Sequence, residues 1–218
     1  MSAPESSGKL RIVHNVAKGP AVDVYIDGKQ VLSNVGYSKV SEHLKVPAGD
    51  HSIEITPHKT IGHLTGVQAS VASGADYTVI VGGDINRPDS LGLLVLQNDR
   101  TCPQRGQTHI RFVQAAHTLP NVDVWVDGPT MLFRNVAYGS SGIPAYVPIQ
   151  AKNYHVGVSS SGSKDLVAKP QEISLKDGLI YTMVSSGIVD DKDTPNKILL
   201  IKDSADGICY VGDVQTKI

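Results

Sequence analysis

The chain has 218 residues, with 20 Lys and Arg against 21 Asp and Glu, and a formal net charge of −1. This balance leaves no basic patch of the kind that binds a phosphate backbone, so we expect no nucleic-acid partner. The longest apolar run, around Leu91 to Leu96, is far shorter than the about 18 residues of a membrane-spanning helix, so no transmembrane segment is expected. The length suits two domains of about 100 residues each.

The N-terminus has neither the basic region nor the apolar stretch of a secretory signal peptide, so the sequence predicts a protein made in the cytoplasm. Residues 1–8 are rich in Ser, Pro and Gly, and we expect them to form a flexible tail.

A seven-residue motif, Val-Asp-Val-Tyr-Ile-Asp-Gly at 22–28, returns one hundred positions later at 122–128 as Val-Asp-Val-Trp-Val-Asp-Gly. Further residues, among them Arg11 and Arg111, recur at a similar offset. A period of this length fits a duplicated small domain. The predicted organisation is a first repeat at 9–102, a short linker at 103–107 and a second repeat at 108–218.

Alternation of apolar and polar residues predicts short strands in both repeats. In the first repeat they lie at 10–13, 22–26, 31–35, 40–46, 51–56, 66–71, 76–82 and 91–97. In the second repeat they lie at 108–114, 121–127, 130–136, 144–149, 153–159, 170–175, 180–186 and 197–203. Asp27-Gly28 predicts a tight hairpin turn, because glycine tolerates positive φ. Many short strands without a sustained helical period predict an all-β sandwich or barrel in each repeat.

Three segments of the first repeat, at 10–14, 20–28 and 46–49, resemble the domain-of-unknown-function family 4397. The second repeat departs from the pattern, with Gln114 in the place of His14. The resemblance implies two tandem immunoglobulin-like antiparallel β-sandwich domains, usually on exported or surface proteins of bacteria and archaea. The family has no established catalytic residues, so none are carried over.

The two cysteines, Cys102 and Cys209, each follow the last predicted strand of their repeat. With one cysteine in each repeat, a disulfide would have to join the two domains and bring the Cα atoms within about 4.4–6.8 Å. We expect two free thiols in a reducing compartment instead.

The motif's carboxylates are the first candidates for catalysis. Asp23 and Asp27 lie on one face of a strand, about 13 Å apart. Glycosidases need a separation of about 5–9.5 Å. We therefore expect Asp27 to serve the turn and Asp23 to be solvated or hydrogen-bonded, with Asp123 and Asp127 in the same roles. No nucleophile elbow or phosphate-binding loop occurs, and no catalytic residue is predicted.

Histidines and an acidic loop are the candidates for metal binding. His51, His58 and His63 could meet at a zinc ion, but they lack a zinc-binding spacing. The acidic residues 190–193 fit no calcium-binding loop. We predict no metal and no cofactor. We expect His14 to make a structural hydrogen bond to a loop backbone.

Two aromatic residues, Tyr25 and Trp125, occupy equivalent positions on the face opposite the inward valines. Exposed aromatics there could stack on sugars or pack at an interface, so they are the predicted binding residues.

These observations favour a non-catalytic structural or interaction protein that acts in a cell-surface, shell or virion assembly, with protein partners or self-association. A carbohydrate-binding module is the alternative, with a glycan bound at Tyr25 and Trp125. A hydrolytic enzyme is the third hypothesis.

Overall fold

A computed structural model describes residues 6–60, 62–143, 145–167, 169–203 and 207–212. The chain divides into two compact units. Unit 1 comprises residues 1–98 with 115–117, and unit 2 comprises residues 99–114 with 118–218. The division falls at Asn98, so the segment predicted as a linker belongs to unit 2. Residues 1–5 of the predicted tail lie outside the described residues, and the first strand begins at Ser7.

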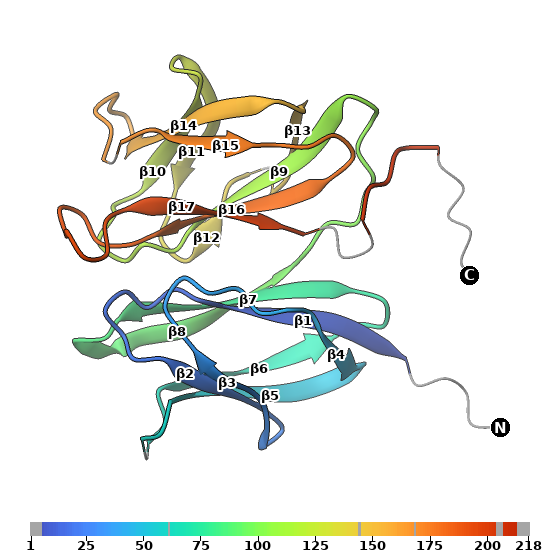
Figure 1. Cartoon of the computed structure of the whole chain (residues 1–218), viewed down its shortest axis with the longest axis vertical. Coiled ribbons are helices and arrows are strands. Elements are labelled where there is room, and N and C mark those ends of the chain that lie inside the picture. Colours follow the sequence, from blue (N-terminus) through green and yellow to red (C-terminus); the bar gives the residue numbers. More distant parts are fainter. Residues whose placement is uncertain (1–5, 61, 144, 168, 204–206, 213–218) are drawn as a thin grey trace. The chain divides into compact units, whose positions relative to one another are not determined.

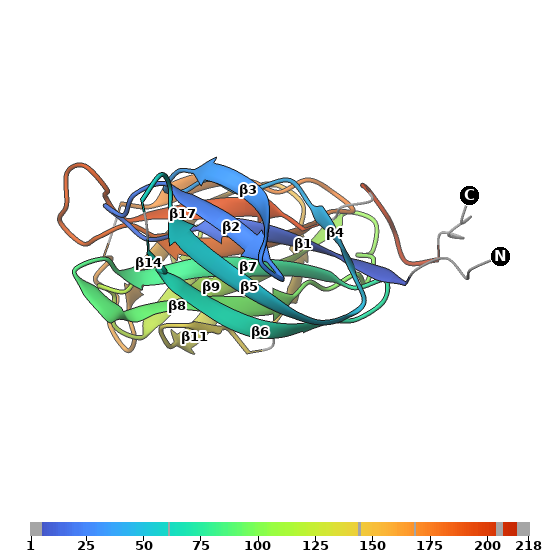
Figure 2. The same cartoon turned by 90° about the horizontal axis from the view of Figure 1, so that it is seen from below.

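The described residues of unit 1 form eight strands: Ser7–His14 (β1), Val22–Ile26 (β2), Lys29–Val35 (β3), Leu44–Pro47 (β4), Gly49–Pro57 (β5), Thr65–Val71 (β6), Asp76–Asp84 (β7) and Arg87–Gln97 (β8). One sheet has the order β4-β1-β7-β8 and the other has the order β3-β2-β5-β6 (Figures 1 and 2). The predicted strands are confirmed, with shifts of a few residues at their ends.

The core of unit 1 lies between its two sheets. Leu10 and Ile12 on β1 and Val79 on β7 pack in one cluster with Val24 on β2 and Ile55 on β5. The side chains of Ile12, Val24 and Ile55 are fully buried. In β2, Val22, Val24 and Ile26 alternate with Asp23 and Tyr25. One face of the strand therefore enters the core, and the other points away from it. The all-β sandwich is therefore confirmed.

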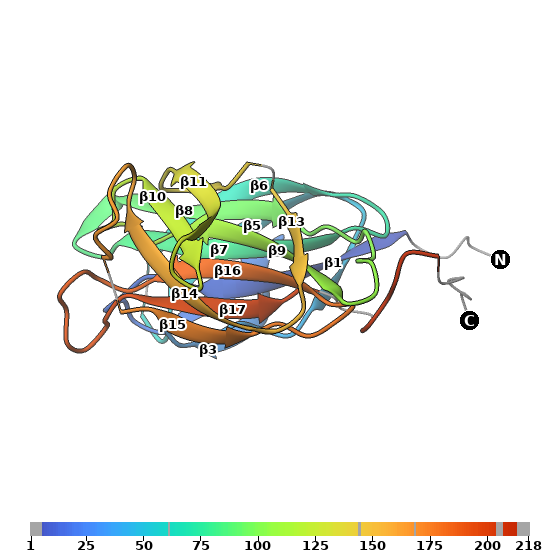
Figure 3. The same ribbon diagram turned by 90° about the horizontal axis from the view of Figure 1, so that it is seen from above.

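Unit 2 repeats this plan with Gln107–Gln114 (β9), Val122–Val126 (β10), Thr130–Val136 (β11), Ser140–Ser141 (β12), Val147–Gln150 (β13), Asn153–Ser160 (β14), Gln171–Ser174 (β15), Ile180–Ser186 (β16) and Lys197–Lys202 (β17). Its sheets have the orders β11-β10-β14-β15 and β12-β9-β16-β17, and β13 also pairs with β9 (Figures 1 and 3). Phe112 on β9 and Phe133 on β11 meet across the core, with ring centroids 6.3 Å apart.

Two details of unit 2 differ from the sequence-based expectation. Ser140 and Ser141 lie between the predicted strands at 130–136 and 144–149, but they pair with Gln114 and Val113 as a short strand. The strand predicted at 144–149 is observed at Val147–Gln150, and residue 144 lies outside the described residues.

Among the strands of the described residues, each unit has one parallel pair beside its antiparallel ones. β1 runs parallel to β7, with Leu10 opposite Tyr77, and β9 runs parallel to β16, with Ile110 opposite Tyr181. The alternating pattern of a strand does not show its direction relative to a partner, so the sequence did not reveal this. The sandwich with this pairing is consistent with the immunoglobulin-like description.

The hairpin turns of the repeated motif have the predicted geometry. Asp27 and Gly28 have φ of 50° and 73°, and Asp127 and Gly128 have φ of 47° and 87°. Two successive positive φ values are typical of a type I′ turn, whose twist matches that of the flanking strands. Glycine at the second position avoids the steric cost that a side chain would add.

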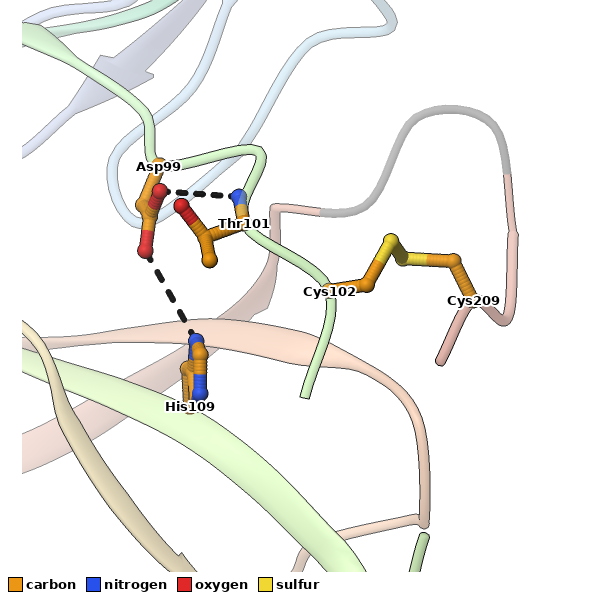
Figure 4. The surroundings of a disulfide bond; sticks show 5 residues. All are labelled: Asp99, Thr101, Cys102, His109 and Cys209. Atoms are coloured by element: carbon orange, nitrogen blue, oxygen red, sulfur yellow. Dashed lines mark hydrogen bonds and ion pairs between the residues drawn. A yellow bond between two sulfur atoms is a disulfide. The ribbon is translucent and has the colours of Figure 1, made fainter. Parts of the chain in front are cut away.

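The expectation of two free thiols is wrong, because Cys102 and Cys209 form a disulfide with Cα atoms 5.3 Å apart (Figure 4). The assignment of one cysteine to each repeat caused the error. Unit 2 already begins at Asp99, so both cysteines lie in the same unit. The bond joins the first segment of unit 2 to its last.

The described residues form no helix of the length and apolar character that crossing a bilayer requires.

Candidate functional site

The repeated motif places its polar and aromatic side chains on the outward faces of β2 and β10. In unit 1 these are Asp23 and Tyr25, followed by Asp27 in the turn. In unit 2 the same positions hold Asp123, Trp125 and Asp127. Because these residues recur and lie beside the turn, they form the candidate site of each unit.

The first aspartate of each motif holds a backbone bulge rather than a substrate. In unit 1, Asp23 Oδ1 accepts hydrogen bonds from the Asn34 amide at 2.8 Å and from His58 Nδ1 at 2.8 Å. Asn34 has a φ of 57°, and the pairing of β2 with β3 shifts register beside it. Burial by itself raises the pKa of Asp23, but these hydrogen bonds outweigh it and hold the pKa below 3.8.

Unit 2 repeats the arrangement more completely. Asp123 is 1% exposed, and its two oxygens accept the Asn135 amide at 2.7 Å and the Gly162 amide at 2.9 Å. Asn135 has a φ of 50°, like its counterpart in unit 1. Burial by itself raises the pKa of Asp123, but the two amide hydrogen bonds outweigh this effect and hold the pKa below 3.8. The expectation of a hydrogen-bonded strand aspartate is confirmed in both units.

The second aspartate of unit 1 binds a histidine. Asp27 Oδ1 accepts the Ser52 amide at 2.9 Å, and Oδ2 lies 2.6 Å from His51 Nδ1. His51 Nε2 donates to the Pro47 carbonyl at 2.8 Å. Both ring nitrogens face oxygen acceptors, so the protonated imidazolium satisfies both contacts. The hydrogen bond to Asp27 raises the pKa of His51 above 6.5 against the opposing effect of burial.

In unit 2 a lysine supplies the cation. Lys152 Nζ lies 2.7 Å from Asp127 Oδ2, and the His155 amide donates to Oδ1 at 3.1 Å. Tyr154 stands at the strand position of His51 and donates its hydroxyl to the Gln150 carbonyl at 2.9 Å. The two units therefore build the same turn with a titratable cation in one and a permanent cation in the other.

This difference leads to an expected pH dependence of unit 1. The folded pKa of His51 is raised, so its contribution to stability is complete below 6.5 and is lost as the pH rises through the folded pKa. We expect His51→Gln to destabilise unit 1 at a pH about one unit below 6.5 and to have much less effect about two units above it. Urea unfolding, followed by amide hydrogen exchange of β5, measures the stability of unit 1 in the wild type and the variant at both pH values.

The difference in free energy of unfolding between wild type and variant isolates the contribution of His51. The opposing pH dependence of His14, whose pKa is lowered by burial, is present in both proteins and cancels. Lys152→Gln is the matched control, and its effect should not change over this pH range. A pH-independent effect of His51→Gln would contradict the assignment.

The predicted binding aromatics are only partly accessible. Tyr25 and Trp125 are both half-buried rather than exposed. Trp125 Nε1 donates to Ser159 Oγ at 2.9 Å, and Ser159 Oγ donates to the Ser163 carbonyl at 2.8 Å. The indole N–H is therefore used within the chain, and only the ring surface remains for a ligand.

His14 has the predicted structural role. It is fully buried, donates from Nε2 to the Pro20 carbonyl at 2.8 Å, and accepts the Val16 amide at Nδ1. Gln114 performs the same task in unit 2, donating Nε2 to the carbonyls of Leu119 and Pro120. His14 and Gln114 thus both bind the loop that follows their strand, although the residue type differs between the two units.

The other candidate ligands are not brought together. His51 binds Asp27 near one end of β2, and His58 binds Asp23 near the other. In the acidic loop, Asp191 Oδ1 accepts the backbone amides of Asp193 and Thr194, which closes the loop on itself. In the described part of the chain, no group of three or more His, Cys, Asp or Glu side chains could hold a metal ion.

Comparisons with solved structures give only weak likeness. The Bacillus anthracis TIE protein is 11% identical with a TM-score of 0.27, over 83% of this chain and 34% of that one. A leucine-rich repeat protein from Bacteroides thetaiotaomicron VPI-5482 is 14% identical with a TM-score of 0.24, over 86% of this chain and 27% of that one. The chain thus spans about a third or less of their length. No curated protein matches it.

The family described as domain of unknown function DUF4397 matches residues 8–125 and again residues 109–208. The two matches correspond to the two repeats and include the hairpin motif of each. The chain therefore belongs to the DUF4397 family and carries its domain in tandem.

Proposed function

We propose that the chain is a non-catalytic structural or interaction protein that acts through its surfaces in a larger assembly. The observation that supports this proposal is the structural role of the four motif aspartates, Asp23, Asp27, Asp123 and Asp127. Each of them accepts a backbone amide that fixes a turn or a bulge, and they recur in both units with these roles. The repeated motif therefore maintains two rigid sandwiches and the surfaces they present.

The disulfide supports a cell-surface setting for this assembly. Disulfides persist in oxidising compartments and are rare in the cytosol. Cys102 and Cys209 are also the only cysteines of the chain. Maleimide labelling of protein from its native source should find no free thiol until a reductant is added. Full labelling without reductant would contradict the proposed setting.

The assembly role is tested by the size of the native particle. We expect the protein from its native source to sediment or elute far above the 23.2 kDa of one chain, alone or with a stoichiometric partner. Analytical ultracentrifugation and crosslinking before extraction measure this. A monomer in both the extracted and the crosslinked sample would refute the proposal.

A carbohydrate-binding module is the second candidate, favoured by the position of Trp125 on the outward face of β10. Aromatic rings bind sugars through their faces, and the half-buried indole retains part of its ring surface. Trp125 is the only tryptophan, so its fluorescence reports directly on a bound sugar.

We expect a binding glycan to quench or shift this fluorescence in a saturable manner. Tyr25→Ala, which removes the equivalent ring of unit 1 and leaves the fluorophore intact, serves as the comparison variant. Unchanged fluorescence across a broad glycan panel would remove this candidate. The hydrolytic alternative has no support from Asp23 and Asp27, because their carboxylates are bound to backbone amides and histidines.

A further inference from the structure

Strand β8 is the longest strand of the described residues and lies at an edge of its sheet (Figures 1 and 2). On one side it pairs with β7, and no strand of the described residues pairs with its other side. Residues 90–98 contain neither a charged residue nor a proline. Proteins usually protect such an edge with lysine, proline or a bulge, because its free backbone groups bind further strands. The edge of β8 therefore has the features of a strand-binding surface.

The register with β7 shows which backbone groups of β8 face the open edge. The Asn98 amide donates to the Asp76 carbonyl at 2.8 Å. In an antiparallel pair, residues whose backbone groups face the neighbouring strand alternate with residues whose groups face away. The alternation from Asn98 therefore directs the N–H and C=O groups of Leu93 and Val95 to the open edge. Leu94, between them, directs its groups to β7.

Unit 2 closes the equivalent edge with a side chain. Tyr77 and Tyr181 are equivalent, because they pair with corresponding residues of β1 and β9, and the antiparallel registers then align Leu93 with Ile198. The side-chain amide of Gln171 on β15 donates to the Ile198 carbonyl at 2.9 Å and accepts the Ile198 N–H at 3.0 Å. The backbone groups of Ile198 are thus unavailable to a further strand.

Unit 1 has valine at the place of this glutamine. Ile53 and Val156 are equivalent, because each pairs with the last residue of β2 or β10. Their partners on the next strand are Val67 and Gln171. The valine side chain has neither donor nor acceptor and packs against the core of unit 1. In addition, β17 begins and ends with lysine, whereas residues 90–98 are uncharged. The open edge is therefore a property of the sequence of unit 1 and is not imposed by the fold.

We propose that β8 pairs with β8 of a second copy of this chain, antiparallel across a two-fold axis at Leu94. In this register Leu93 lies opposite Val95 of the second copy, and both direct their backbone groups to the shared edge. Such a pair exchanges two N–H···O hydrogen bonds, and the two-fold axis produces the pair twice. The dimer is one contact of the assembly proposed above, and the proposal rests on that function.

The side chains on the outer face of β8 favour a second copy as the partner. The same register places Leu96 opposite Gly92 of the second copy. A Cβ at Gly92 would have no neighbour within 4 Å among the described residues, so the space beside it accommodates the leucine. Leu94 lies opposite its own counterpart. Because residues 90–98 are uncharged, no like charges meet across the axis.

Cysteine crosslinking of the full chain tests this register. Leu94→Cys should form an intermolecular disulfide under mild oxidation, because the pair at the axis has Cα atoms about 4.5 Å apart, within disulfide range. Leu96→Cys is the matched control, since it lies on the same face and is half-buried too, but faces Gly92 of the second copy. Non-reducing electrophoresis should show a covalent dimer of the first variant only. Equal crosslinking of both variants, or of neither, would overturn the proposal.

Sedimentation of the purified chain measures the association itself. The wild type should form a dimer of twice 23.2 kDa with a Kd on the order of 10 μM, as for a small interface. Leu94→Lys should weaken the dimer at least about tenfold, because it places two like charges opposite each other. Leu199→Lys, the equivalent change in unit 2, should leave the association unchanged.

Hydrogen exchange of β2 and β5 shows whether unit 1 remains folded in Leu94→Lys, and the crosslinking decides the proposal if it does not. A wild type that stays monomeric at 100 μM would overturn the β8 dimer. A large native particle held by other contacts would in that case still support the proposed function, so the two failures are distinguishable.

Discussion

Removal of the Cys102–Cys209 disulfide is expected to destabilise unit 2 by about 4 kcal/mol, the largest effect of a change outside its core. The bond closes a loop with a sequence separation of 107 residues, which contains almost all of unit 2. Crosslinking a loop of this length removes much of the conformational entropy of the unfolded chain. Urea unfolding of the Cys102→Ser/Cys209→Ser double variant, followed by Trp125 fluorescence, measures the loss.

Unit 1 provides the control for this experiment, since it contains neither cysteine. Its hydrogen-exchange protection in β2 and β5 should be the same in the double variant and the wild type. An unchanged midpoint of the Trp125 transition would show that the bond does not stabilise unit 2.

The segment at Cys209 and Tyr210 has further contacts with unit 2 that remain without the disulfide. The Cys209 amide donates to the Gly178 carbonyl, and the Tyr210 hydroxyl donates to Asp177 at 2.9 Å. The Arg105 guanidinium lies 4.3 Å from the centre of the Tyr210 ring. These contacts are individually weak, so we expect the double variant to lose exchange protection at this segment first.

The second large effect is expected from Asp123→Ala, which should destabilise unit 2 by about 3 kcal/mol. The substitution leaves the amides of Asn135 and Gly162 without their acceptors, and hydrogen bonds to a charged group contribute about 1.5–3 kcal/mol each. Trp125 lies two residues further along the same strand, so its fluorescence follows the unfolding of this unit.

The pH dependence of the same variant provides an independent check. The folded pKa of Asp123 is lowered, so its contribution is present above 3.8 and is lost as the pH falls through the folded value. The difference between wild type and Asp123→Ala should therefore shrink in acid. Asp123→Asn is the isosteric comparison and should also be destabilising. Its side-chain NH₂ group replaces one carboxylate oxygen and would face the backbone N–H of Asn135 or Gly162, so that one hydrogen bond is lost. Equal stability of Asp123→Ala and wild type would refute the role.

Part of the candidate site was predictable because its physics is local. The positive φ of Asp27-Gly28 follows from the turn, and the inward valines follow from alternation along β2. The hydrogen bond of His14 was also predicted. The histidine partners of Asp23 and Asp27 were not, because they come from β5 and the residue after it, more than twenty positions away.

The comparison of the repeats alone missed a small cavity of unit 2 that is lined by Gln171, Ser185 and Asn196. Gln171, Ser185 and Asn196 replace Val67, Val81 and Leu91, but loops of different length separate the two copies. Only the strand register aligns these positions.

The sequence by itself determined that the chain is a duplicated all-β protein, because alternation, turn residues and repetition are properties of neighbouring positions. The tertiary structure alone decided the pairing of Cys102 with Cys209, the parallel alignment of β1 with β7 and the cavity at Asn196. Each of these depends on residues far apart in the chain that meet only after the sheets have formed.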